Sequence, residues 1–221
     1  MRVVSTIDTS HPTLVRICVE DGENVQELKS ITMDDYVQLV NGSVTAQKKM
    51  QRIGKLPDGF YDGGYESITG TYEAIIHVPG SKRPIFFMEK SHMVAFPSLV
   101  FLFKAERNRI TKSLVFAVDD SNGLTEESEL YHYPYGNVYH DARICWGRNE
   151  LPKISSLADF GGVVNLFFGS PTNNDLYEPP KVKHEGKEFK PSQMELIDFM
   201  KNEEKFPFNF LKSANGNLGE L

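Results

Sequence analysis

The residues from Tyr72 to Val118 read YEAIIHVPGSKRPIFFMEKSHMVAFPSLVFLFKAERNRITKSLVFAV, and they contain four short apolar runs rich in β-branched and aromatic side chains. These runs are Tyr72–Val78, Pro84–Met88, Leu99–Lys104 and Leu114–Val118. Gly, Pro, Asn or Asp residues stand between them, which is typical of strands that are joined by tight turns. Such short links leave no room for crossover helices. We therefore predict an antiparallel meander rather than alternating parallel units.

An extension is expected before this sheet. Two apolar runs favour strands of an opening hairpin, with Asp21-Gly22 as a turn signal. They are Arg2–Ile7 and Leu14–Val19. Two short helices should follow, the first capped by Thr32 and ended by Asn41-Gly42. These helices are predicted over Met33–Val40 and Val44–Ile53.

A helix is also predicted near the carboxyl end, from Ser192 to about Lys201, where apolar residues recur at helical spacing. The sheet with helices at both ends of the chain makes the fold class α+β. We expect residues 1–70 to be an N-terminal extension packed on the core, residues 71–212 to be the core, and residues 213–221 to be a flexible tail.

The composition argues against several classes of function. The chain has 24 Lys and Arg residues against 30 Asp and Glu residues, a net charge of −6, so its field repels phosphate backbones and nucleic acid is an unexpected partner. The most apolar run, Val94–Phe103, is broken by Pro97 and is too short for a membrane span. The chain has only two cysteines, Cys18 and Cys145, far apart in sequence, which is unlike the disulfide framework of a small secreted protein. We therefore expect a cytoplasmic protein whose thiols are reduced. No sequence pattern predicts a metal site or a bound cofactor.

The stretch from Tyr133 to Gly147, YPYGNVYHDARICWG, holds the second cysteine, Cys145. A free cysteine is usually a small buried apolar residue. Here, however, Cys145 follows an aromatic, glycine-containing loop, and the cation of Arg143 lies close in sequence, which favours a thiolate. Asn137 stands eight positions earlier, near enough for the loop to fold its amide toward the sulfur and stabilise an oxyanion. Both interpretations of Cys145 stay open at this point.

A turn with proline and aromatic residues, an Asn and, eight residues later, Ile-Cys resembles the active-site segment of ubiquitin-conjugating enzymes. Further blocks resemble the prokaryotic ubiquitin-conjugating-enzyme-like family D, also known as the PRTRC system protein B family. The blocks are Arg83-Pro-Ile-Phe-Phe, Pro97-Ser-Leu-Val-Phe, Leu114-Val-Phe-Ala-Val, Tyr133-Pro-Tyr-Gly-Asn-Val, Ile144-Cys-Trp-Gly and Leu166-Phe-Phe-Gly-Ser. The similarity runs from about Arg83 to about Leu211.

This resemblance implies a ubiquitin-conjugating-enzyme-like fold and a carrier step. An adenylating activating enzyme would load a ubiquitin-like modifier onto its own cysteine, and Cys145 would take the acyl group by thioester exchange. The modifier would then pass to an amine of a protein substrate. A thiolate suits this role because it is both a good nucleophile and a good leaving group. The carrier itself would bind no metal and no nucleotide.

Two departures from the family pattern keep alternatives open. Tyr135-Gly136 replaces the His-Pro pair of the ubiquitin-conjugating motif, and Ser170-Pro-Thr-Asn173 stands where family D usually has a histidine. The candidates for a base or an orienting group are His140 and an acidic residue of the later loop, Asp175 or Glu178. The absent histidines favour a second hypothesis, a catalytically inactive interaction module that scaffolds the modifier and the activating enzyme. A cysteine hydrolase that uses Cys145 and His140 is a third.

Overall fold

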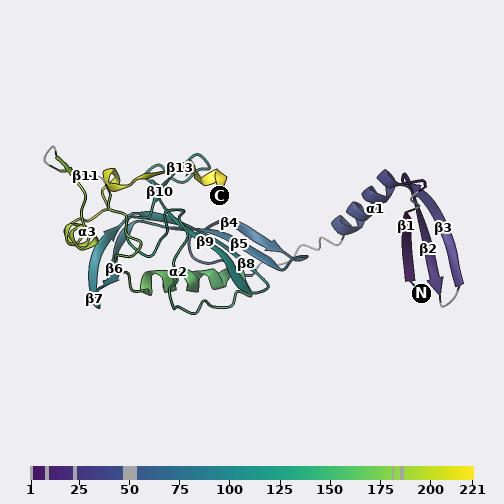
Figure 1. Cartoon of the computed structure of the whole chain (residues 1–221), viewed down its shortest axis with the longest axis horizontal. Helices are drawn as coiled ribbons and strands as arrows, with labels where there is room; N and C mark the ends of the chain where they lie inside the picture. The colour runs from purple at the N-terminus through teal and green to yellow at the C-terminus, as the bar shows by residue number, and fades with distance from the viewer. Residues whose placement is uncertain (1, 8–9, 22–23, 47–53, 181, 185–186) are drawn as a thin grey trace. The chain divides into compact units, whose positions relative to one another are not determined.

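The computed structural model of the chain describes residues 2–7, 10–21, 24–46, 54–180, 182–184 and 187–221. The chain divides into two compact units, residues 1–52 and residues 53–221 (Figure 1). We describe each unit by itself. No helix in these described ranges is long and apolar enough to cross a membrane.

The first unit is an antiparallel sheet followed by one helix. The sheet has the order β1-β2-β3, with β1 (Arg2–Ile7), β2 (Leu14–Asp21) and β3 (Asn24–Thr32), and the helix is α1 (Met33–Ala46). The Thr32 hydroxyl accepts a hydrogen bond from the Asp35 N–H at 3.1 Å and so caps α1, as expected.

Helix α1 continues through Asn41-Gly42, where the sequence predicted a break, so the expectation of two short helices was wrong at this point. A glycine inside a helix costs about 1 kcal/mol relative to alanine, which weakens a helix without ending it. The rest of the second predicted helix, residues 47–53, lies outside the described residues.

The second unit is built on a six-stranded antiparallel sheet. Its strands, in sheet order, are β13 (Ser213–Asn217), β10 (Glu129–His132), β9 (Arg109–Val118), β8 (Ser98–Glu106), β5 (Thr71–Val78) and β4 (Phe60–Glu66). The predicted strands at 72–78, 99–104 and 114–118 are confirmed. The antiparallel pairing of β8 with β9, which follow one another along the chain, is confirmed as well, whereas β10 was not predicted.

The predicted meander is wrong at one point. Strands β6 (Ser81–Phe87) and β7 (Lys90–Phe96) form a separate two-stranded hairpin, so β5 pairs with β8 rather than with β6 (Figure 1). Strand β7 was not predicted because its apolar end runs into β8 with no polar residue between them. Only Pro97, which has no N–H to donate, separates the two strands.

The main core lies between one face of the large sheet and helix α2 (Phe160–Gly169). Helix α2 runs along that face and follows the short 3-10 helix η1 (Leu157–Asp159) (Figure 1). Phe101 and Phe103 point from β8 toward this helix, where the ring of Phe103 stacks on Phe160 and the ring of Phe101 meets Phe167 edge-on. These aromatic contacts fix α2 against the strands that lead to the site described below.

The carboxyl-terminal part of the chain completes this unit. It contains the small hairpin β11 (Val182–His184) and β12 (Lys187–Phe189), helix α3 (Gln193–Met200), and the 3-10 helices η2 (Phe208–Phe210) and η3 (Leu218–Glu220). The predicted helix is present as α3, and Ser192 and Glu195 form its capping box. Its buried face includes Leu196, Ile197 and Met200, whereas Phe199 is exposed.

Two segments at the expected domain limits belong to this sheet. Strand β4, within the range that the sequence assigned to the extension, pairs with β5. Residues 213–221, expected to be a flexible tail, form the edge strand β13 and η3, and Leu218 is buried on the other face of the sheet against Val100 and Val118. Strand β10 supplies hydrogen-bond partners for the backbone of this segment, and Val100 and Val118 supply an apolar contact for Leu218. Neither interaction could be predicted from the polar sequence of the segment itself.

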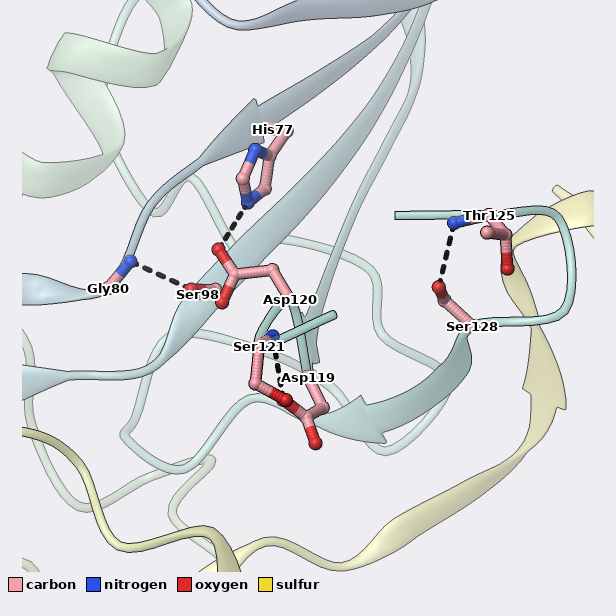
Figure 2. Close-up of polar contacts among 8 residues, drawn as sticks. All are labelled: His77, Gly80, Ser98, Asp119, Asp120, Ser121, Thr125 and Ser128. Carbon is pink, nitrogen blue, oxygen red and sulfur yellow. Dashed lines mark hydrogen bonds and ion pairs between the residues drawn. The ribbon is translucent and has the colours of Figure 1, made fainter. Parts of the chain in front are cut away.

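A polar cluster closes one end of the sheet on the face away from α2. His77 Nε2 lies 3.0 Å from Asp120 Oδ2, and the Ser98 hydroxyl accepts a hydrogen bond from the Gly80 N–H at 2.8 Å (Figure 2). These contacts join β5, the start of β8 and the loop after β9. We therefore assign this His-Asp pair a structural role.

Candidate functional site

The loop that contains Cys145 is a short antiparallel hairpin on the edge of β9. The Cys145 N–H donates to the Asn137 carbonyl at 2.8 Å, and the Tyr139 N–H donates to the Arg143 carbonyl at 2.9 Å. The chain reverses over residues 139–142, where the Ala142 N–H returns to the Tyr139 carbonyl at 2.9 Å. The spacing of eight residues therefore makes Asn137 and Cys145 cross-strand partners.

Strand β9 holds this hairpin in place. The Ile144 N–H donates to the Ser113 carbonyl at 3.0 Å, and the Val115 N–H donates to the Ala142 carbonyl at 3.0 Å. Trp146, directly after the cysteine, donates its indole N–H to the Ser113 hydroxyl at 3.0 Å and packs against the main core. These contacts make Trp146 an anchor of the hairpin on the core.

The Cys145 thiol is free and partly exposed. The Tyr139 hydroxyl donates a hydrogen bond to Cys145 Sγ at 3.7 Å, and this contact, together with the charge of the thiolate form, raises the pKa of Tyr139. The sequence analysis did not single out Tyr139. Its position two residues after Asn137, on the strand opposite Cys145, was the signal that could have identified it.

The Asn137 side chain braces the loop in this structure. Its amide donates to the Pro171 carbonyl at 2.7 Å. The residue also has φ +68°, in the left-handed region that Asn tolerates better than most residues. Asn137 therefore joins the hairpin to the loop that follows α2.

The two residues that replace the His-Pro pair anchor the same loop. The buried Tyr135 donates its hydroxyl to the Ala95 carbonyl at 2.7 Å, which fastens the loop to β7. Gly136 lies so close to the 172–173 segment that an added Cβ would stand 2.4 Å from the Asn173 carbonyl oxygen and 2.5 Å from Thr172 Oγ1. Only a residue without a side chain fits there.

The other candidate residues lie on exposed parts of the same region. His140 is exposed in the turn of the hairpin, and Asp175 is exposed in a loop where it contacts Asn173 at 3.0 Å. Within the described part of the chain, no hydrogen bond joins either residue to Cys145. Arg143 binds Asp141 at 2.6 Å, and that hydrogen bond lowers the pKa of the carboxyl group.

Among the described residues, no group of three or more His, Cys, Asp or Glu side chains is arranged to hold a metal ion. A half-buried histidine, His132, precedes the hairpin. Its pKa is lowered mainly by burial and to a smaller extent by the nearby charge of Lys212. The arrangement as a whole presents one accessible thiol on a rigid loop.

Comparison with known proteins agrees with the motif and the fold. No curated protein and no solved structure matches the chain. The model of the family described as prokaryotic E2 family D matches residues 35–214. These residues include α1 except its first two residues, the six-stranded sheet except the last three residues of β13, and the Cys145 hairpin. The match covers more than half of the chain and confirms the resemblance, and the chain therefore belongs to prokaryotic E2 family D.

Proposed function

We propose that the protein carries a ubiquitin-like modifier as a thioester on Cys145. The thiolate attacks the carbonyl carbon of the thioester on the activating enzyme, and the thiolate of that enzyme leaves. In the second step an amine of a protein substrate attacks the new thioester. An amide bond then forms, the Cys145 thiolate is released, and the amine loses its proton.

The observation that carries this proposal is the partly exposed sulfur of Cys145 on a braced hairpin, with the Tyr139 hydroxyl as a hydrogen-bond donor to it. A hydroxyl that donates to sulfur stabilises a thiolate and holds the side chain in one orientation. Family membership supports the same role. Asn137 would keep the hairpin in position through Pro171 and stabilise the oxyanion with its amide.

A second candidate is an inactive conjugating fold that binds the modifier and the activating enzyme without a covalent step. Two observations favour it. Neither His140 nor Asp175 is hydrogen-bonded to Cys145 in the described structure, and the Asn137 amide is already engaged by Pro171. This scaffold would keep the same partners and lose only the acyl transfer.

One incubation distinguishes the two candidates. The protein is mixed with its cognate activating enzyme, the modifier and ATP, and analysed on a non-reducing gel. A carrier gives an adduct that dithiothreitol removes, that Cys145→Ala abolishes and that Cys145→Ser converts into a longer-lived ester. Cys18→Ala, which changes the other free thiol, is the matched control and should leave the adduct unchanged.

Binding of both partners without an adduct would instead establish the scaffold. Cleavage of modifier precursors or conjugates without ATP would indicate the hydrolase considered from the sequence. An adduct that persists in Cys145→Ala would place the acyl group on another residue and refute the role of Cys145.

A further inference from the structure

A cavity of about 560 Å³ lies beside the segment that leads into the Cys145 hairpin. Its walls come from three parts of the chain, residues 132–134, residues 178–180 and residues 210–212, together with Lys190. The backbone joins two of these walls, since the His132 N–H donates to the Lys212 carbonyl at 2.9 Å. The volume is within the range of cavities that bind small molecules or anchor side chains.

The walls of this cavity are largely apolar. Tyr133, Pro134, Pro179, Pro180, Phe210 and Leu211 line it. Such walls suit a bulky apolar group, because its burial removes apolar surface from water on both partners. Burial also lowers the pKa of His132, so that its neutral ring adds one donor and one acceptor to the wall.

The charged groups of the cavity favour an acidic ligand. Among the described residues that line the cavity, there are two lysines, Lys190 and Lys212, and one carboxylate, Glu178, which lies 3.5 Å from the Lys212 ammonium. Both members of that pair are more than half exposed, so the pair is weak and Lys212 stays available to a stronger anion. The cavity is therefore a positive site on a chain with a net charge of −6.

Both sides of the cavity are continuous with the Cys145 site. Residues 132–134 run directly into Asn137, and residues 178–180 end the loop that begins at Pro171, the acceptor of the Asn137 amide. A ligand in the cavity would therefore contact both segments that hold the hairpin.

We propose that this cavity is a docking site for an acidic peptide segment of a protein partner, with a bulky apolar side chain beside its carboxylate. The apolar side chain enters between the prolines and Phe210, and the carboxylate binds Lys190 and Lys212. This inference rests on the partner binding in the proposed function but does not require the thioester.

Amide chemical shifts of the full-length Cys145→Ala variant test the proposal without any acyl transfer. The probe is an N-acetylated tetrapeptide amide that alternates Phe and Glu. We expect it to shift the signals of His132, Leu211 and Lys212. Lys190→Glu should weaken its binding by roughly tenfold. Lys153→Glu, which changes an exposed lysine outside the cavity, is the matched control and should not change the binding.

Two further probes make the result decisive. A tetrapeptide with Lys in place of Glu should bind weakly to the native cavity and more tightly to Lys190→Glu. Equal binding of the two peptides by the native cavity would overturn the proposal, as would unchanged binding of the Glu peptide by Lys190→Glu. Equal affinity for acetate or for an Ala-Glu peptide would show a simple anion site and would also overturn it.

Discussion

Replacement of Asn137 tests whether its side chain is mainly a brace. Asn137→Ala removes the 2.7 Å hydrogen bond to the Pro171 carbonyl, which should cost about 1 kcal/mol at this surface position. Alanine also has to adopt φ +68°, at a cost of about 1 kcal/mol. The free energy of unfolding should therefore fall by about 2 kcal/mol. Asn137→Gly loses the hydrogen bond without the steric cost, so its loss should be about 1 kcal/mol.

Urea denaturation measures both losses. With a slope of about 2 kcal/mol per molar urea, the midpoint should fall by about 1 M for Asn137→Ala and by about 0.5 M for Asn137→Gly. Asn174→Ala, on the loop beside Pro171, changes an exposed asparagine for which the structure shows no side-chain hydrogen bond, and serves as the control. Unchanged midpoints in both Asn137 variants would refute the bracing role.

The same variants separate bracing from a part in the chemistry. If the amide also stabilises the oxyanion, then discharge of the thioester to an amine should slow by more than the loss of stability explains in both variants. If Asn137→Gly discharges as fast as the native protein while it is less stable, then the side chain acts only on the fold of the loop. Discharge and urea denaturation can be measured on the same preparations.

Three other substitutions test separate parts of the second unit. Gly136→Ala would place a Cβ 2.4 Å from the Asn173 carbonyl oxygen, and urea denaturation should show a loss of about 2 kcal/mol; an unchanged midpoint would contradict this close approach. Asp159→Asn removes hydrogen bonds from Ser155 that lower the pKa of this carboxyl group, at a cost of about 1 kcal/mol at neutral pH. A carboxyl group whose pKa is lower in the folded than in the unfolded protein stabilises the fold at any pH above its unfolded-state pKa, and this stability is lost as the pH falls below about 4. Asp159→Asn has no such group at this position, so the variant should lose less stability on acidification than the native protein. Leu218→Ala should cost about 2 kcal/mol by calorimetry, whereas no change would mean that the carboxyl end does not pack on the sheet.

Much of the main sheet could be predicted because each strand is a short apolar run between turn residues. The runs that became β5, β8 and β9 carry that pattern clearly. The pairing of β5 with β8 could not be predicted, because strand order depends on which side chains meet across the sheet and not on the local pattern of any one strand. The same limit explains β13, whose sequence SANGN has little β propensity and pairs only because the edge of β10 is open.

In the candidate site, the local sequence pattern predicted which residues take part, but it did not predict their tertiary contacts. The sequence identified Asn137 and Cys145 through their spacing, and the hairpin pairs their backbones. The side-chain partners could not be predicted. Tyr139 reaches the sulfur because the hairpin places it diagonally across from Cys145, and the Asn137 amide meets Pro171 because α2 returns the chain to this edge of the sheet.

The missing His-Pro pair does not by itself decide between a carrier and a scaffold. Tyr135 is fastened to the Ala95 carbonyl, Gly136 is in close contact with the 172–173 segment, and Asn137 is bonded to Pro171. Three consecutive residues thus fix the loop on two other parts of the chain, β7 and residues 171–173, without a histidine. Because the loop is already rigid, the departures at 135 and 136 leave the accessible thiol of Cys145 in a defined place. The distinction between the two functions therefore depends on whether that thiol accepts the acyl group, which the adduct experiment measures directly.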